Sequence, residues 1–176
     1  LKDRDKYKGP IAIRYPRDVE FGNLDKICDK IEYEDPFKWK VLTKGKDIAL
    51  LSVGTITQDY IDMCKKNNYT LIAVRSVKPL NEEVLQEIIN DYNFVFTIEE
   101  GSILGGFGES VISYYVNNLI DKYPDVRIIN IGISDNFVTH GNRKELLKLV
   151  GLDCENVEKT IKENIEKHLL KGVKNI

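Results

Sequence analysis

Two arginines near the start of the chain are the residues best suited to bind an anion. They belong to the sequence RYPR, residues 14–17, which lies at the end of a predicted strand at residues 11–15. Ligands of open α/β sheets bind beyond the carboxyl ends of strands, and a guanidinium there can hold a phosphate or carboxylate. Arg14 and Arg17 would face opposite sides of a strand. We therefore expect Arg17 to bind the anion, with Arg14 and Tyr15 at most supporting it; ion pairing at a domain boundary is the alternative.

A glycine-rich segment at residues 99–108 joins a predicted strand to a predicted helix. Glycines before a helix N-terminus can hold a phosphate, but this segment is neither GxGxxG nor a P-loop. Its first two residues are acids, which would repel a phosphate. We therefore expect a structural role, in tight backbone packing or at a subunit interface, for Glu99, Glu100, Gly105, Gly106 and Gly108.

Other residues of chemically useful types lack partners. The turn SVGT at residues 52–55 could bind an anion through its amides, although such turns are more often simple connections. His140 has no nucleophile at a recognisable spacing, so we expect it to be structural. We identify no Ser-His-Asp or Cys-His arrangement. The cysteines, at positions 28, 64 and 154, form no CxxC pair; they are typical of free thiols in a reducing compartment, and we expect no metal site.

The composition excludes several classes of protein. The 176 residues carry 26 basic and 28 acidic side chains, a formal net charge of −2, which argues against a nucleic-acid partner. A hydrophobic content of 42% with 31% charged residues indicates a folded globular chain. No apolar stretch approaches the roughly 20 residues that span a bilayer, so we expect no membrane partner. The first residues are charged and include no Met, and we expect that an N-terminal part is missing.

The order of the predicted elements gives the fold class. Apolar runs at residues 47–53, 70–77, 94–98 and 127–133 predict strands. Segments with helical spacing lie between them and at the C-terminal end, at residues 57–67, 82–92, 109–119, 143–150 and 157–170. Alternation of strands and helices predicts an α/β domain, a mostly parallel sheet with helices on both faces. We expect this domain at residues 45–176, a linker at 18–44, and at 1–17 the last strand of a truncated domain.

Five segments, taken in order, resemble the 1-deoxy-D-xylulose-5-phosphate synthase family of the transketolase superfamily, over about residues 9–170. They are RYPR at 14–17, SVGT at 52–55, VRSVKPLN at 74–81, TIEEGSILGGFGESV at 97–111 and INIGISDNFVTHG at 129–141. The resemblance implies a thiamine-diphosphate-dependent transferase that condenses pyruvate with D-glyceraldehyde 3-phosphate and releases CO2. Its product would supply isoprene biosynthesis by the non-mevalonate pathway, as well as thiamine and pyridoxal biosynthesis.

The same resemblance implies how the work is divided within the full-length enzyme. Residues 1–17 would end the pyrimidine-binding domain, and Arg17 would bind the phosphate of the acceptor. The family usually has Gly where this chain has Asp18, a carboxylate that could weaken the grip of that arginine. Thiamine diphosphate and Mg2+ would be bound by the full-length enzyme. The diphosphate motif, the activating glutamate and the catalytic histidines are absent, so we expect no catalytic residue, no bound cofactor and no activity in this chain alone.

Members of the family are homodimers, and we expect the apolar helix face between Val111 and Leu119 to contribute to the subunit contact, a structural role. Two alternatives remain open. One is the C-terminal part of a transketolase proper or of a 2-oxo-acid dehydrogenase E1 β subunit. The other is a stand-alone binding or assembly module without catalysis. A bacterial source would place the enzyme in the cytoplasm; an AT-rich protist would place it in a plastid-type organelle such as an apicoplast.

Overall fold

The computed structural model describes residues 9–12, 35 and 37–173. The chain divides into two compact units, residues 1–33 and 34–176, and the helices and strands named below belong to the second. Of the strand expected at 11–15, only residues 11 and 12 are described, and they are not in a strand. The expected anion-binding residues Arg14, Tyr15 and Arg17, together with Asp18, lie outside the described residues.

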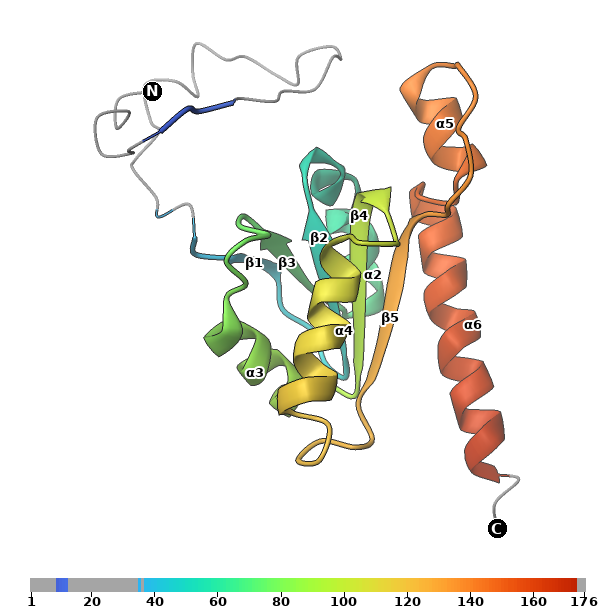
Figure 1. Ribbon diagram of the computed structural model, residues 1–176. Coiled ribbons are helices and arrows are strands. Elements are labelled where there is room, and N and C mark those ends of the chain that lie inside the picture. Colours follow the sequence, from blue (N-terminus) through green and yellow to red (C-terminus); the bar gives the residue numbers. More distant parts are fainter. Residues whose placement is uncertain (1–8, 13–34, 36, 174–176) are drawn as a thin grey trace. The chain divides into compact units, whose positions relative to one another are not determined.

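Five strands form one sheet in the order β1-β3-β2-β4-β5 (Figure 1). The parallel strands are β2 (Ile48–Val53), β3 (Thr70–Val74), β4 (Phe94–Ser102) and β5 (Arg127–Ile133). Strand β1 (Lys40–Thr43) pairs antiparallel to β3 at one edge. The predicted α/β class with a mostly parallel sheet is confirmed.

Strand β1 occupies residues that we expected to be irregular linker. Its burial does not alternate: Lys40 and Val41 are exposed, whereas Thr43 is buried, and the pairing with β3 shifts register between Val41 and Thr43. The hydroxyl of Thr43 donates a hydrogen bond to the carbonyl of Tyr69 at 2.9 Å. Just before the strand, the indole N–H of Trp39 donates to the carbonyl of Ser76 at 3.1 Å. These bonds fasten residues 39–43 to the segments just before and just after β3.

The helices lie close to the predicted positions. They are the 3-10 helix η2 (Thr55–Tyr60) and the α-helices α2 (Ile61–Asn67), α3 (Glu82–Asp91), α4 (Phe107–Asn118), α5 (Arg143–Leu149) and α6 (Cys154–Val173). Asn81 caps α3 as predicted, because its side-chain oxygen accepts a hydrogen bond from the Val84 amide at 3.2 Å. No helix in residues 37–173 is long and apolar enough to cross a membrane.

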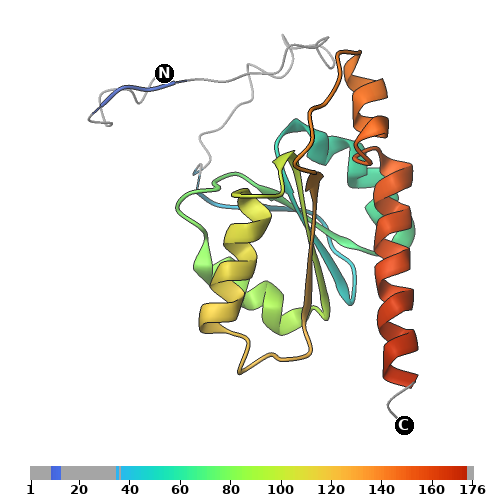
Figure 2. The same ribbon diagram turned by 45° about the vertical axis from the view of Figure 1, so that its right-hand side comes forward.

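Two apolar cores lie on opposite faces of the sheet. Successive residues of β2 point into different cores. Leu50 faces the core built with α2 and α6, while Leu51 faces the core built with α3 and α4. Both residues have no exposed surface. Figure 2 shows the sheet between α3 and α4 on one side and α6 on the other. Burial on both faces explains why the strands are continuous apolar runs.

The order of the strands defines a point where the chain reverses direction across the sheet. From β2 the chain moves to β3 on one side, and from β4 it moves to β5 on the other. The carboxyl ends of β2 and β4 therefore flank the position where open α/β sheets most often bind ligands. The loops at this end position the candidate site.

Candidate functional site

A buried carboxylate occupies the N-terminus of α4. Glu99, at the carboxyl end of β4, is 9% exposed. One oxygen, Oε2, accepts a hydrogen bond from the Phe107 amide at 3.0 Å, and the other, Oε1, accepts one from the Gly108 amide at 3.0 Å. Amides at a helix N-terminus and the helix dipole favour a negative charge. This chain therefore supplies its own anion where a phosphate would otherwise bind.

Glycines allow the backbone to approach this carboxylate. A Cβ atom on Gly106 would lie 2.5 Å from Glu99 Oε1. A Cβ atom on Gly108 would lie 2.5 Å from the side chain of Asn130 and would also clash with the Thr97 hydroxyl. That hydroxyl donates a hydrogen bond to Asn130 Oδ1 at 2.8 Å. The loop is thus packed tightly against β4 and β5, whereas Gly105 has open space around it and φ of +71°.

Charged side chains connect the loops at the switch point between β2 and β4. Arg143, at the start of α5, donates a hydrogen bond to Glu100 Oε2 at 2.9 Å, and its other terminal nitrogen lies 4.0 Å from Asp59 Oδ2 in η2. These contacts connect β4, α5 and η2 across the carboxyl end of the sheet. Sequence reasoning did not single out Arg143 or Asp59, because no motif links residues so far apart along the chain.

The SVGT turn after β2 is held by internal hydrogen bonds. The Thr57 hydroxyl donates a hydrogen bond to the Gly54 carbonyl at 2.7 Å and lies 2.9 Å from the Ser52 hydroxyl, within hydrogen-bond distance. Gly54 has φ of +88°, a backbone conformation that glycine adopts readily. These bonds give the turn a connecting role between β2 and η2.

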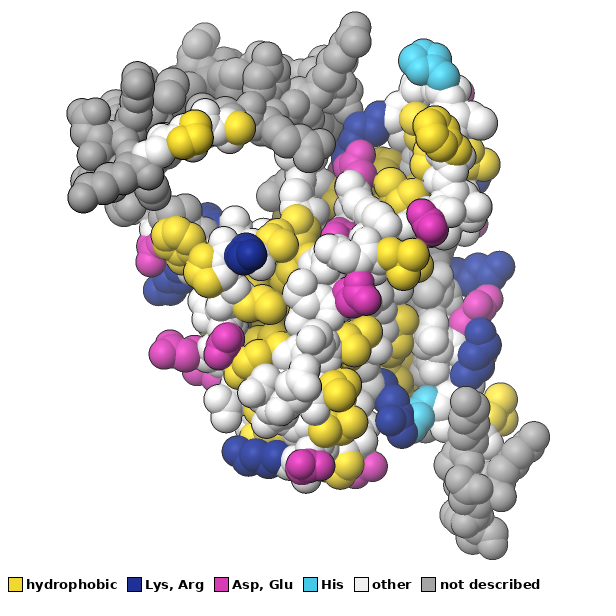
Figure 3. Space-filling view, in the orientation of Figure 1, with side chains coloured by type: hydrophobic (Ala, Val, Ile, Leu, Met, Phe, Trp, Pro, Cys, Tyr) yellow, Lys and Arg dark blue, Asp and Glu magenta, His cyan; other side chains and the backbone are white. Residues whose placement is uncertain are grey.

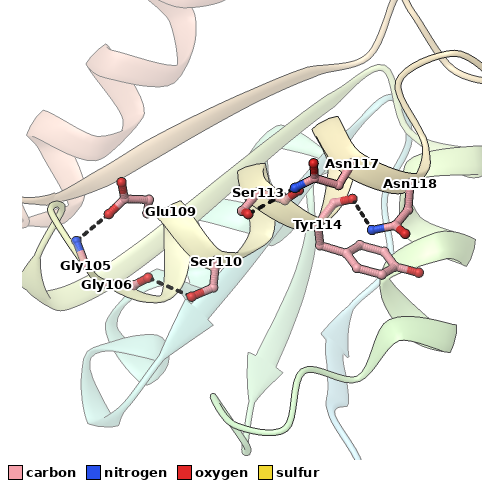
Figure 4. Close-up of a pocket in the computed structure, with 8 residues that line it drawn as sticks. All are labelled: Gly105, Gly106, Glu109, Ser110, Ser113, Tyr114, Asn117 and Asn118. Atoms are coloured by element: carbon pink, nitrogen blue, oxygen red, sulfur yellow. Dashed lines mark hydrogen bonds between the residues drawn. The ribbon is translucent and has the colours of Figure 1, made fainter.

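An open polar groove of about 560 Å³ follows the outer face of α4 (Figure 4). Its polar side chains bond to the backbone of the same helix or of the preceding loop. Asn117 donates to the Ser113 carbonyl at 2.7 Å, Asn118 donates to the Tyr114 carbonyl at 2.9 Å, and Glu109 accepts from the Gly105 amide. No nucleophile and base face each other among the side chains that line the groove, so it has no arrangement for catalysis.

Burial makes the thiol and phenol groups beneath the switch point poor acids. It raises the pKa of the Cys64 thiol to about 12 and the pKa of Tyr60 above its usual range. The Tyr60 hydroxyl donates a hydrogen bond to the Leu152 carbonyl at 2.6 Å. Burial and the nearby carboxylate of Asp59 also raise the pKa of Cys154. Neither thiol has the lowered pKa of a catalytic cysteine.

His140, which we expected to be structural, lies in the loop after β5. It is exposed. No group of three or more potential metal ligands occurs among the residues that the structure describes. Within that part of the chain, the polar groups at the carboxyl end of the sheet serve packing and connection between loops.

The strand order and the glycine loop, whose helix N-terminus is capped by Glu99, define an α/β domain with a mostly parallel sheet. The family model described as "Transketolase, C-terminal domain" matches residues 37–157. The chain belongs to this family.

Curated relatives and a solved structure agree with this assignment. The chain is 37% identical over 161 residues to the 1-deoxy-D-xylulose-5-phosphate synthase of Thermotoga petrophila, covering 92% of this chain and 25% of that protein. It is 34% identical over 163 residues to the enzyme of the same name from Vibrio parahaemolyticus, covering 92% and 25%. The chain thus spans about a quarter of the length of these relatives. A structure named "Split gene transketolase, inactive beta4 tetramer" matches with a TM-score of 0.65 and 25% identity, over 76% of this chain and 43% of that one.

Proposed function

We propose that this chain is the C-terminal part of a 1-deoxy-D-xylulose-5-phosphate synthase. The observation that carries the proposal is the identity of 37% to such an enzyme across 92% of this chain. The whole enzyme condenses pyruvate with D-glyceraldehyde 3-phosphate and releases CO2. In this proposal, Arg17 binds the phosphate of the acceptor, with Arg14 and Tyr15 in support.

The domain at residues 37–173 has a structural role within that enzyme. Its Glu99 carboxylate already occupies the helix N-terminus after the glycine-rich loop, so the diphosphate of thiamine diphosphate does not fit there. That cofactor supplies carbanion chemistry, and we assign its binding, with Mg2+, to the rest of the enzyme. The chain by itself is inactive in this proposal.

We also propose a homodimer, whose contact uses the part of the expected helix face that is exposed. Val111, Tyr115 and Leu119 are buried in this domain's own core, so these residues of the expected face are already covered. Val116 in α4 and Ile120, two residues beyond its end, are 49% and 39% exposed. Helix α4 packs beside β5, an edge strand with no further strand beside it among the described residues. Figure 3 shows apolar side chains gathered along this side of the domain.

An uncovered apolar edge strand is a template for association, which supports a second copy on this face. We name the surface formed by Val116, Ile120 and the free side of β5 the α4–β5 face. The glycine loop, Glu99, Glu100, Gly105, Gly106 and Gly108, holds the N-terminal end of α4 in place beside it. The relatives named above are bacterial, and we favour the bacterial cytoplasm over an organelle.

Product formation by the whole reading frame tests the function. The assay supplies pyruvate, D-glyceraldehyde 3-phosphate, thiamine diphosphate and Mg2+, and compares the whole protein with the 176-residue chain. We expect 1-deoxy-D-xylulose 5-phosphate from the whole protein and none from the chain. Turnover by the chain alone would refute its structural role. Turnover only with a ketose donor and a sugar-phosphate acceptor, or with a lipoyl acceptor, would instead support transketolase or a 2-oxo-acid dehydrogenase.

A further inference from the structure

Two large apolar side chains project from the loops at the carboxyl end of the sheet. Leu104, in the loop after β4, is 60% exposed, and Phe137, in the loop after β5, is fully exposed. Residues 134–142 carry a single acid, Asp135, and no lysine or arginine. Exposed apolar side chains on neighbouring, weakly charged loops mark an interaction surface. We name the loops at residues 103–106 and 134–142, which include Leu104 and Phe137, the apex.

The backbone of the apex is fastened to the sheet. The Ile103 amide donates a hydrogen bond to the Ile133 carbonyl at 3.0 Å, so the two loops leave the sheet side by side. At the far end of the second loop, Asn142 caps α5 by accepting a hydrogen bond from the Glu145 amide at 3.0 Å. Arg143 then holds the start of α5 to Glu100. The apex is therefore presented by a fixed frame.

The chain enters this domain at the same end of the sheet. Strand β1 runs antiparallel to β3, and its first residue, Lys40, pairs with Ala73, next to the carboxyl end of β3. The carboxyl ends of the parallel strands β3, β2, β4 and β5 lie at one edge of the sheet. Polypeptide that precedes residue 37 is thus joined to the domain on the edge that presents the apex.

We propose that Leu104 and Phe137 dock against the part of the longer enzyme that lies outside this chain, on its N-terminal side. The inference rests on the proposed function, because the relatives are about four times as long as the matched region, which covers 25% of their length. A domain joined at this edge reaches the apex without a long connection. The two exposed apolar side chains and the weak charge of the loops fit a contact with protein better than a charged ligand. The α4–β5 face is left free for a second copy.

Thiol labelling of two matched variants tests the docking. Phe137→Cys places a thiol at the apex, and Leu170→Cys places one near the C-terminal end of α6, at the opposite end of the domain in Figure 1. Leu170 is 65% exposed. Each variant is made in the whole reading frame and in the 176-residue chain, then labelled with a maleimide, and the labelled peptide is quantified by mass spectrometry so that native cysteines are counted separately.

In the whole protein, we expect the thiol of Phe137→Cys to react at least about tenfold more slowly than that of Leu170→Cys, because the site must open before it reacts. In the 176-residue chain, the two thiols react at similar rates. Leu104→Cys serves as a second apex variant with the same expectation.

Equal labelling of the three thiols in the whole protein would overturn the docking. Protection that already exists in the 176-residue chain and disappears on dilution would also overturn it, by assigning the apex to a second copy. Product formation by the unmodified whole protein is measured in parallel. Protection of the apex without product would refute the proposed function and support the docking. Product without protection would support the proposed function and refute the docking.

Discussion

The carboxylate of Glu99 accepts a hydrogen bond from the backbone amide of Gly108 at 3.0 Å, nine residues further along the chain. The second carboxylate oxygen accepts from Phe107 in the same way. Strand β4 thus ends in the group that caps the following helix. The geometry explains why two acids precede a glycine loop that otherwise looks suited to a phosphate: the first is the ligand of the helix, and the second, Glu100, pairs with Arg143.

Glu99→Gln should destabilise the domain by about 2 kcal/mol, because the amide nitrogen cannot accept a hydrogen bond and the charge at the helix N-terminus is lost. The free energy of unfolding from urea titration measures the effect. The adjacent Glu100→Gln is the matched control. Its ion pair with Arg143 is partly exposed, so we expect a loss of at most about 1 kcal/mol. Equal losses for the two variants would contradict the capping role of Glu99.

Gly108→Ala should cost about 3 kcal/mol, since the added Cβ atom meets the side chains of Asn130, which is half-buried, and Thr97, which is buried. Gly105→Ala is the matched control in the same loop. Nothing lies within 4 Å of its added Cβ atom, and the penalty of about 1 kcal/mol comes only from its φ of +71°. Thermal or urea unfolding of both variants provides the comparison. A larger loss at Gly105 than at Gly108 would refute the close packing of this loop.

Much of the fold could be predicted because strands and helices carry local patterns. The apolar run at residues 127–133 matches β5, and Asn81 followed by two acids marked the start of α3. Strand β1 was not predicted, since its four residues, KVLT, are too few and show no alternation that would distinguish them from the segment before them. Its place in the sheet depends on β3, some 30 residues away in sequence, and on the Trp39 side chain.

The candidate site was predictable only where its parts are neighbours in sequence. The glycine-rich loop could be recognised, and the acids in it argued against a phosphate. The bond from Thr97 to Asn130 and the contact of Arg143 with Glu100 and Asp59 join residues from different elements. Only the strand order brings these elements together, and no motif spacing encodes that order. Periodicity also finds the apolar face of α4 but not what covers it: Val111, Tyr115 and Leu119 pack in this domain's own core, whereas Val116 is exposed.

The stability of the domain should fall at alkaline pH. Burial raises the pKa of Cys64 from 9.0 to about 12, so the folded state favours the neutral thiol. This contribution is complete below about pH 9 and is lost as the pH rises towards 12, at up to about 1.4 kcal/mol per pH unit. Tyr60 adds to the fall above pH 10, because burial raises its pKa as well.

Urea unfolding at pH 8, 9 and 10 measures this trend. Cys64→Ala should reduce the fall between pH 9 and pH 10, whatever its effect on stability at pH 8. An unchanged slope in that variant would show that Cys64 does not cause the pH dependence.

Val116→Asp should weaken self-association of the whole protein, because it places a charge on the α4–β5 face. Val116 is 49% exposed, so the change should leave folding intact. Val41→Asp is the control: Val41 is 56% exposed on β1, at the other edge of the sheet. Sedimentation equilibrium gives the dissociation constant, and we expect a rise of about tenfold or more for Val116→Asp alone. A similar rise for both variants would place the subunit contact elsewhere.

Arg17→Ala tests the one chemical role that we assign to this chain. In the whole enzyme, loss of a guanidinium that binds phosphate should raise the KM for D-glyceraldehyde 3-phosphate by about tenfold or more, while the KM for pyruvate stays close to the wild-type value. Arg17→Lys keeps the charge but not the bidentate geometry, so its KM for D-glyceraldehyde 3-phosphate should lie between those of the wild type and Arg17→Ala. Asp18→Gly removes the neighbouring carboxylate and should lower the same KM if that carboxylate competes for Arg17. A fall in kcat for Arg17→Ala with an unchanged KM for the acceptor would instead give Arg17 a role in the transition state rather than in binding.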